Sequence, residues 1–429
     1  MSNLQKFIRL KVLSIRILIF ITLFSQFILS QDTNKTKTNN ILPEFDLSDP
    51  FKICWKLENE ELVNNIIASD NTGNKSYLFE SSVGGIIKFL NPESGEKRWE
   101  TNLGGEILST PYIDGENIYI VSKPKRNQNE VSTNNEVSTN NKVSTDDNEE
   151  NIIIRSLSIS SGLTIWQTNL KTNLNPEQIF LYIHKSTLLL ADENGNLHSI
   201  YKNDGVYNWQ KTLNVKLSAP PYFYAGKAIL GTFEKQLIIL NLGEGETYKK
   251  VELRIIPSAI SFNSNDGTLF VGDRKGIVLS IKIEKIDFEI SKKEKNTKNN
   301  NWELRLGAEV SDISFTPRGL LITSLDNFVY LISVEKGNLI WKRRLAGRIF
   351  EKSLVLDNYA LLTTIAEPAI SVVDLSTGRL INKIILEDGN FVTANLIKTR
   401  NKIIVPTSKG LYAFSPNECY KVEDQPLGR

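Results

Sequence analysis

Histidine and cysteine are scarce in this 429-residue chain, which has two of each, and the common catalytic motifs are missing. It contains no Gly-x-Ser-x-Gly nucleophile turn, no His-Glu-x-x-His zinc motif and no phosphate-binding loop. His184 and His198 could bind a metal as a pair, but no cysteine or carboxylate cluster accompanies them, so two ordinary strand residues are favoured. We therefore expect no catalytic residue, no metal site, no cofactor and no enzymatic activity.

Long amphipathic helical patterns are missing as well. From residue 51 onward, short apolar runs alternate with turn residues, and several pairs of runs flank a tight turn, as the strands of a β-hairpin do. The expected hairpin strands are 76–80 with 85–90, 187–191 with 197–201, 268–272 with 277–283, and 320–324 with 328–333. This pattern indicates an all-β chain that forms either a sandwich or a closed ring.

Neither sign of charge dominates the chain, which has 51 basic and 49 acidic residues. The first 30 residues include Lys6, Arg9, Lys11 and Arg16, no acidic residue, and an apolar run at 17–29. This pattern predicts a secretory signal peptide at 1–30, with an uncleaved membrane anchor as the alternative. Without this segment the chain has 47 basic and 49 acidic residues. That balance argues against a nucleic-acid-binding surface.

Six tryptophans recur along the chain, and a glycine stands four residues before four of them. The pairs are Gly95 with Trp99, Gly162 with Trp166, Gly205 with Trp209 and Gly337 with Trp341, and the other tryptophans are Trp55 and Trp302. Two further copies have lost the indole, at Tyr248 and Asn382. Apart from two intervals lengthened by insertions, the marks are about 39 to 44 residues apart, the length of a four-stranded propeller blade. The sequence therefore predicts an all-β, eight-bladed β-propeller in which each indole fills the gap between neighbouring blades.

Two low-complexity segments interrupt the repeat. Residues 123–150 separate two expected strands of one unit, 117–121 and 152–159, and we expect a disordered hairpin tip, with a docking tail as the alternative. The lysine-rich segment 291–301 is expected to be a solvated loop. The expected organisation is a signal peptide at 1–30, a flexible linker at 31–50, the propeller at 51–420 and a tail at 421–429.

Charged residues near the expected turns have an ordinary explanation. Aspartates stand at strand ends, where a carboxylate accepts backbone hydrogen bonds, so none is taken as a general base. They are Asp192, Asp204, Asp266, Asp273, Asp326 and Asp374. Arg343, Arg344 and Arg348 follow a tryptophan and form either a basic contact patch or, as we favour, a solvated rim.

The two cysteines indicate how the ring closes. Cys419 lies at the turn that would precede a tryptophan-bearing strand, but no such strand follows it, whereas a surplus strand begins at Cys54. We therefore expect the N-terminal strand to complete the last blade, which removes two exposed sheet edges. This closure brings the cysteines together, and export supplies an oxidising compartment, so we expect a Cys54–Cys419 disulfide. Two buried free thiols are the alternative.

The repeat, Gly-x-x-x-Trp followed by a leucine and then Ile-x-Ser-x-Pro, resembles that of propellers named after pyrroloquinoline quinone enzymes. The resemblance covers about residues 51–420 and is clearest at 94–119, 209–240 and 336–345. Within this class, an exported chain with eight units is most similar to the BamB family of outer-membrane β-barrel assembly factors. That resemblance implies a non-catalytic scaffold in the periplasm or at the outer-membrane periphery, whose protein partner is a BamA-type barrel-insertion protein.

The sequence departs from this family in two ways. No cysteine lies near Ser30, so the lipid attachment usual in the family is not indicated. The family's partner-binding loop corresponds here to 213–220, which leaves Lys216 and Leu217 as the nearest candidates for partner contacts. Two other readings remain open: an exported propeller that binds another protein or ligand, and a quinoprotein dehydrogenase. The lack of adjacent cysteines and of extra loops disfavours the dehydrogenase.

Overall fold

The computed structural model describes residues 46–59, 61–70, 76–124, 152–170, 176–282, 301–399, 401–416 and 419. Within these ranges the chain forms 33 β-strands. No helix long and apolar enough to cross a membrane occurs in this part of the chain. The expected signal peptide at 1–30, the linker up to residue 45, the insertion from 125 onward, the lysine-rich segment up to 300 and the tail at 421–429 lie outside it.

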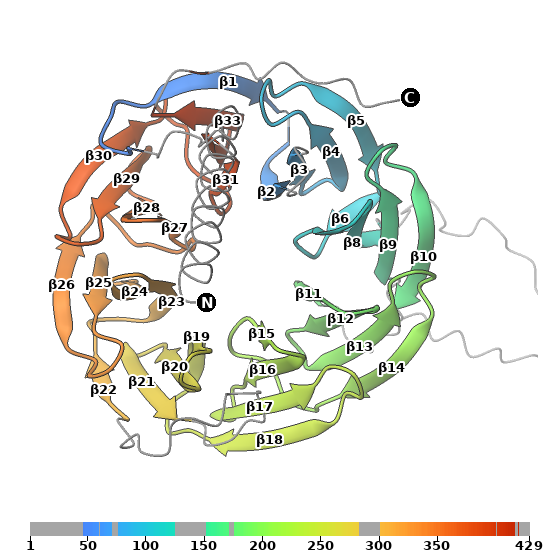
Figure 1. The fold of residues 1–429 in the computed structure, drawn as a ribbon. Coiled ribbons are helices and arrows are strands. Elements are labelled where there is room, and N and C mark those ends of the chain that lie inside the picture. The colour runs from blue at the N-terminus through green and yellow to red at the C-terminus, as the bar shows by residue number, and fades with distance from the viewer. Residues whose placement is uncertain are drawn as a thin grey trace, which may run out of the picture. The chain divides into compact units, whose positions relative to one another are not determined.

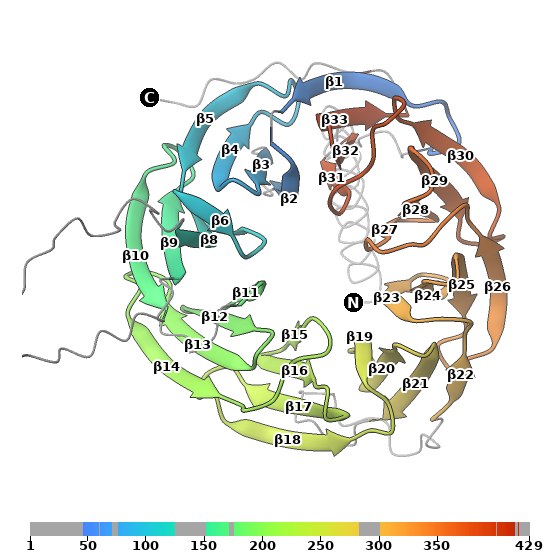
Figure 2. The same ribbon diagram turned by 180° about the vertical axis from the view of Figure 1, so that it is seen from behind.

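Eight antiparallel sheets make up the fold, and each is one blade of a ring (Figures 1 and 2). The strands of each blade are given from the inside of the ring outward. Blade 1 has β2 (Val63–Asp70), β3 (Ser76–Ser82), β4 (Ile86–Leu90) and β5 (Lys97–Asn102), and blade 2 has β6 (Gly105–Ile107) with β7 (Tyr112–Asp114), then β8 (Asn117–Pro124), β9 (Ile152–Ser158) and β10 (Thr164–Leu170). Blade 3 has β11 (Ile179–His184), β12 (Thr187–Asp192), β13 (Asn196–Tyr201) and β14 (Tyr207–Thr212), and blade 4 has β15 (Tyr222–Tyr224), β16 (Lys227–Gly231), β17 (Gln236–Asn241) and β18 (Thr247–Glu252). Blade 5 has β19 (Pro257–Asn263), β20 (Thr268–Asp273), β21 (Ile277–Lys282) and β22 (Glu303–Arg305), and blade 6 has β23 (Val310–Thr316), β24 (Gly319–Ser324), β25 (Phe328–Ile332) and β26 (Leu339–Arg344). Blade 7 has β27 (Leu354–Leu356), β28 (Tyr359–Thr363), β29 (Ala369–Asp374) and β30 (Leu380–Ile385), and blade 8 has β31 (Ile397–Thr399), β32 (Lys402–Thr407), β33 (Gly410–Ser415) and β1 (Lys52–Glu58).

The N-terminal strand closes the ring. β1 pairs with β33, with Trp55 opposite Ala413, so the last blade has the strand order β1-β33-β32-β31 (Figure 1). A disulfide joins Cys54 of β1 to Cys419, and their Cα atoms are 5.3 Å apart. The predicted eight-bladed fold is confirmed, and the last blade is completed by the N-terminal strand as expected.

The burial of each strand follows from its place in the blade. The second strands lie between neighbouring blades, and every residue of β12, β24 and β32 is buried. Because both faces are covered, such strands are nearly continuous apolar runs. The fourth strands have one face toward solvent, and residues of β5 alternate between exposed and half-buried along most of its length. Between blades 2 and 3, for example, Leu188 and Leu190 pack with Val121 and Ile154.

Each tryptophan joins its blade to a turn of the next blade. The indole N–H of Trp341 donates to the carbonyl oxygen of Leu375 at 2.8 Å. Gly378 in the same turn has a φ of +68°, and a Cβ atom there would lie 2.6 Å from the Trp341 ring. Both the backbone conformation and the neighbouring ring therefore require glycine. The same hydrogen bond, at 2.7 to 3.1 Å, joins Trp55 to Pro92, Trp99 to Ile159, Trp166 to Lys202, Trp209 to Gly243 and Trp302 to Val334.

Two of the eight junctions have no indole. In blade 4 the register places Lys249 opposite Ile239, where blade 1 has Trp99 opposite Phe89. The sequence-based choice of Tyr248 is therefore wrong by one residue, because the spacing from the preceding glycine sets the register and the aromatic ring does not. In blade 7 the expected residue, Asn382, occupies this position.

Residues before β1 pack beside Asn382. Its Nδ2 donates to the carbonyl oxygens of Leu47 at 3.0 Å and Asp49 at 2.6 Å. Leu47 is fully buried. Residues 46–50, which we expected to belong to the flexible linker, are therefore part of the propeller.

Candidate protein-binding face

The two faces of the ring are built from different connections. Because the strands of a blade alternate in direction, the loop that leads to the next blade lies on the same face as the turn between the second and third strands. We call this the inter-blade face, and we call the opposite face, which carries the Gly-x-x-x-Trp turns, the turn face. The inter-blade loops differ in length, from 103–104 to 386–396. Unequal loops on a rigid frame are where binding residues are usually found.

Six exposed apolar side chains lie on the inter-blade face of three consecutive blades, the seventh, the eighth and the first. We call them the apolar arc: Phe350, Ile365, Ile385, Phe391, Leu62 and Val83. Their exposed fractions are 48% to 69%. Single exposed apolar residues are normal on a soluble protein, but a gathering of them over neighbouring loops is typical of a contact surface.

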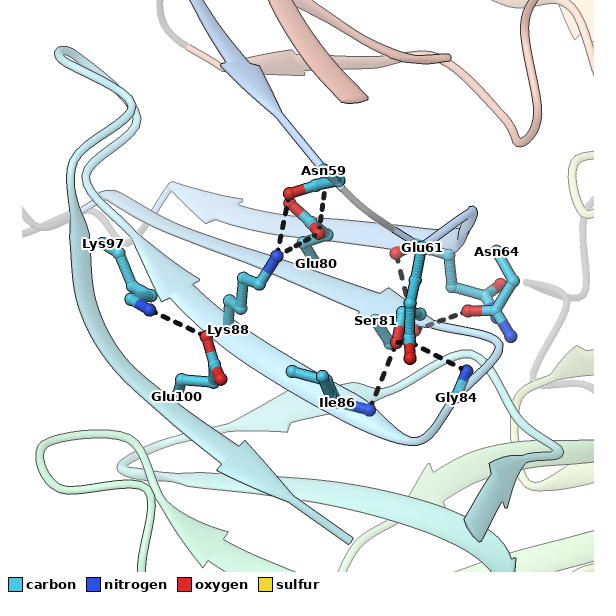
Figure 3. Close-up of polar contacts among 12 residues, drawn as sticks. Asn59, Glu61, Asn64, Glu80, Ser81, Gly84, Ile86, Lys88, Lys97 and Glu100 are labelled. Atoms are coloured by element: carbon cyan, nitrogen blue, oxygen red, sulfur yellow. Dashed lines mark hydrogen bonds and ion pairs between the residues drawn. The ribbon is translucent and has the colours of Figure 1, made fainter. Parts of the chain in front are cut away.

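The loop from blade 8 to blade 1 is held by Glu61 (Figure 3). The Oε2 atom of Glu61 accepts a hydrogen bond from the Ser82 hydroxyl at 2.5 Å and from the Gly84 N–H at 3.2 Å. A Cβ atom at position 84 would lie 2.2 Å from the same oxygen, so any larger residue there would displace the Glu61 carboxylate. The Val83 N–H also donates to the carbonyl of Leu62 at 3.2 Å. The two apolar side chains of blade 1 therefore stand on loops that are tied together.

Buried charges support this loop. Asn59 donates to Glu80 Oε1 at 2.7 Å and accepts from Lys88 Nζ at 2.8 Å, and Lys88 pairs with Glu80 at 3.2 Å (Figure 3). Glu80 is 1% exposed, and burial raises the pKa of its carboxyl group, while Lys88 opposes this rise. Lys402 of β32 and Glu93 of blade 1 form a second buried ion pair. Removing one partner of either pair would leave a buried charge. The Glu80–Lys88 pair lies within blade 1 and reaches the loop through Asn59, whereas the Lys402–Glu93 pair joins blade 8 to blade 1.

The loop from blade 7 to blade 8 is tied in the same way. Ser408 donates its N–H to the Phe391 carbonyl at 2.9 Å and its hydroxyl to Asn390 Oδ1 at 3.0 Å. The carbonyl of the next residue, Lys409, accepts the N–H of Asn59 at 3.3 Å. Backbone and side-chain hydrogen bonds thus connect the loops of blades 7, 8 and 1. Side chains on such loops lose little conformational entropy when a partner binds.

The loop that the sequence predicted as a contact lies on the same face, between blades 3 and 4. Lys216 is exposed, whereas Leu217 is only 5% exposed and packs in the core between these blades. The Lys216 carbonyl accepts the N–H of Phe233 at 3.1 Å, and the Arg274 guanidinium lies over the Phe233 ring at 4.9 Å. Lys216, Phe233 and Arg274 form what we call the basic-aromatic patch. Sequence reasoning missed the last two because different blades supply them.

His184 and His198 do not share a site. His198 pairs with Leu190, which faces blade 2, whereas His184 contacts Gly226 of blade 4. His198 is 7% exposed, and burial lowers its pKa to about 4, so its ring is neutral at pH 7. No group of three potential metal ligands occurs in the part of the chain that the structure describes.

The aspartates at strand ends accept backbone hydrogen bonds, as the favoured explanation required. In each case Oδ1 accepts a hydrogen bond from a backbone N–H at 2.7 to 3.1 Å. The N–H groups of Asn194 and Asn196 donate to Asp192, that of Val206 to Asp204, that of Thr268 to Asp266, those of Lys275 and Ile277 to Asp273, that of Phe328 to Asp326, and that of Thr377 to Asp374. Arg343 donates to the carbonyl of Gly378 at 2.6 Å, whereas Arg344 and Arg348 are exposed.

Comparison with known proteins agrees with this architecture. The model of the family described as outer membrane protein assembly factor BamB matches residues 149–285, from blade 2 into blade 5. BamB from Moraxella catarrhalis superimposes with a TM-score of 0.60 and 12% identity, over 85% of this chain and 99% of that one. The computationally designed Ika8 protein (13% identity, 99% of its chain) and Sqt1 from Saccharomyces cerevisiae (12%, 98%) also have TM-scores of 0.60 and cover 85% of this chain. No curated protein sequence matches.

At such low identities the solved structures show the fold alone, whereas the family match concerns the repeat itself. The fold supports a role as a protein-binding scaffold, because a rigid ring displays its loops in fixed positions. The chain is therefore an eight-bladed β-propeller whose fold resembles that of BamB and whose repeats at 149–285 match the BamB family model.

Proposed function

We propose that the chain is a non-catalytic scaffold that binds proteins through its inter-blade face and acts in outer-membrane protein assembly. The match of residues 149–285 to the BamB family model carries the proposal, since that family is described by this role. In this proposal the N-terminal segment directs the chain to the periplasm or the outer-membrane periphery. The partner is a BamA-type barrel-insertion protein.

Two parts of the inter-blade face are the proposed contacts. The basic-aromatic patch, with Lys216, offers cations beside a half-exposed ring, and the apolar arc offers side chains that lose water on binding. Aromatic and arginine residues contribute most of the binding energy at interfaces, which places Phe233 and Arg274 at the centre of the first contact. Leu217 supports that contact from within the core.

Affinity capture from envelope extracts of the source organism tests the proposal. The tagged full-length chain should recover a BamA-type protein. Ile365→Asp and Lys216→Glu should each lower recovery about tenfold, the usual effect of a strong interface residue. Leu163→Asp is the matched control, because Leu163 is 70% exposed against 69% for Ile365 but lies on the turn face.

Two results would contradict the proposal. One is failure of the wild-type chain to recover any component of the barrel-insertion machinery. The other is quinone-dependent dye reduction by the purified chain, which would indicate a dehydrogenase.

A further inference from the structure

A cavity of about 510 Å³ is lined by residues from the inner parts of four consecutive blades, blades 4 to 7. The inner strands of these blades, β15, β19, β23 and β27, follow one another around the ring in Figure 1. We call this cavity the axial pocket. Its lining comes from β15, from the end of β19 and the turn after it, from β23, and from the start of β27: Tyr222, Ser261, Phe262, Asn263, Ser264, Asn265, Ser314, Phe315, Ser353 and Val355. These segments lead into turns between first and second strands, so the pocket lies toward the turn face. It is therefore separate from the proposed protein-binding face.

The lining is polar without being charged. Seven of its ten residues carry a hydroxyl or an amide, and none carries a formal charge. Groups of this kind both donate and accept hydrogen bonds, as the hydroxyl groups of a ligand do. A cavity of this size with a few convergent polar groups and aromatic walls is a typical small-molecule site.

Phe315 supplies a fixed aromatic surface. Its ring is 38% exposed although it stands on an inner strand. The ring contacts the buried Phe270 edge to face, with centroids 5.6 Å apart and an interplanar angle of 61°. One edge of Phe315 is thus held by the core, while the remaining surface is available to a ligand with an apolar face.

The lining of the pocket offers no cation to an anionic ligand, although Lys352 lies near Asp312 outside the lining. Asp312, 8% exposed, accepts the Ser314 hydroxyl at 2.6 Å, and its charge stands behind the pocket wall. Glu351 precedes Ser353 by two residues, and burial raises the pKa of both carboxyl groups. No lining cation is present to bind a phosphate or carboxylate. A neutral ligand fits better.

We propose that the axial pocket binds a neutral oligosaccharide, with the apolar face of one sugar ring on Phe315 and a sugar hydroxyl group at the side-chain amide of Asn265. This inference does not rest on the proposed assembly role. An uncharged lining rich in hydroxyl and amide groups and a fixed aromatic ring together match a ligand that has many hydroxyl groups and a flat apolar face.

Isothermal titration of the full-length chain with chitotetraose, cellotetraose and maltotetraose tests the inference. At least one should bind with a Kd of about 1 mM or lower. Phe315→Ala should weaken binding about tenfold and Phe315→Tyr should preserve it, since the ring face is kept. Asn265→Ala should weaken binding about threefold without lowering the Tm, because this exposed side chain lies in the pocket lining.

Phe350→Ala is the control, because this exposed phenylalanine lies on the inter-blade face. Its affinity for the sugar should equal that of the wild type. Absence of binding by all three sugars at about 10 mM, or equal affinity in Phe315→Ala, would overturn the inference. Binding of a neutral Gly-Ser hexapeptide in place of every sugar would overturn it in favour of a peptide site.

Discussion

The two faces of the ring differ in how closely their parts repeat. On the turn face, six junctions share one geometry, in which an indole donates to a backbone carbonyl of the next blade. On the inter-blade face, six loops begin with the same hydrogen bond, from a leucine N–H to a carbonyl oxygen of the turn between the second and third strands, but the rest of the loop varies in length from 103–104 to 386–396. Parts that repeat maintain the ring, and parts that differ are free to carry a contact specific to this protein.

The two junctions without an indole show that the repeated contact needs two parts, an indole on one blade and a glycine turn on the next. We call this pair an indole joint. The glycine of each copy faces the indole of the preceding blade, as Gly378 faces Trp341. Where blade 4 has Lys249, the facing connection between β21 and β22 carries the lysine-rich insertion. Where blade 7 has Asn382, the facing position is the meeting point of the two chain ends. An indole is therefore absent where the turn that would receive it is interrupted.

The largest expected effect concerns the closing blade. Replacing both cysteines, Cys54→Ser with Cys419→Ser, should lower the free energy of unfolding by as much as about 5 kcal/mol, because the bond closes a very long loop in the unfolded chain. Thermal unfolding with and without reductant measures this. Reductant should lower the Tm of the wild type and leave the double variant unchanged. Equal Tm values for both proteins would show that β1 holds without the bond.

Next is the glycine of an indole joint. Gly378→Ala should cost about 3 kcal/mol, since the methyl group meets the Trp341 ring and the backbone has positive φ. Gly389→Ala is matched in φ, at +72° against +68°, but has open space around it, and should cost about 1 kcal/mol. Chemical denaturation gives both values. Equal losses would mean that the ring contact contributes nothing.

A smaller loss is expected at the junction that Asn382 occupies. Asn382→Ala removes the hydrogen bonds to the carbonyls of Leu47 and Asp49 and should cost about 1 to 2 kcal/mol. Asn338→Ala, an exposed asparagine in a turn of blade 6, is the control and should be neutral. If Asn382→Ala leaves the free energy of unfolding unchanged in chemical denaturation, the contacts of residues 46–50 do not stabilise the closed ring.

The smallest effect is expected from adding an indole where the joint is missing. Lys249→Trp should change the free energy of unfolding by less than about 0.5 kcal/mol, because no glycine turn of the usual kind follows in blade 5. A gain in the free energy of unfolding comparable to the contribution of an indole joint would contradict the conclusion that both the indole and the glycine turn are needed.

Much of the fold could be predicted because its signal is local. The glycine-to-tryptophan spacing, the hairpin turns and a surplus strand at Cys54 are visible within a few residues of sequence. They were enough for the blade number and for the closure. Tyr248 was chosen wrongly since an aromatic residue was preferred to a fixed spacing.

The candidate sites could be predicted only in part, because distant segments form them. Lys216 was found from its loop, but the burial of Leu217 depends on packing between two blades. The pairing of Glu80 with Lys88 depends on which face of the sheet each side chain takes. The axial pocket needs the inner strands of four blades, and no local pattern announces it.

The most direct test of the division between the faces measures partner recovery and Tm on the same two variants, Ile365→Asp and Gly378→Ala. We predict that Ile365→Asp loses the partner and keeps its Tm, whereas folded Gly378→Ala keeps the partner and melts at a lower temperature. The reverse pattern, with recovery intact in Ile365→Asp and lost in folded Gly378→Ala, would contradict the account.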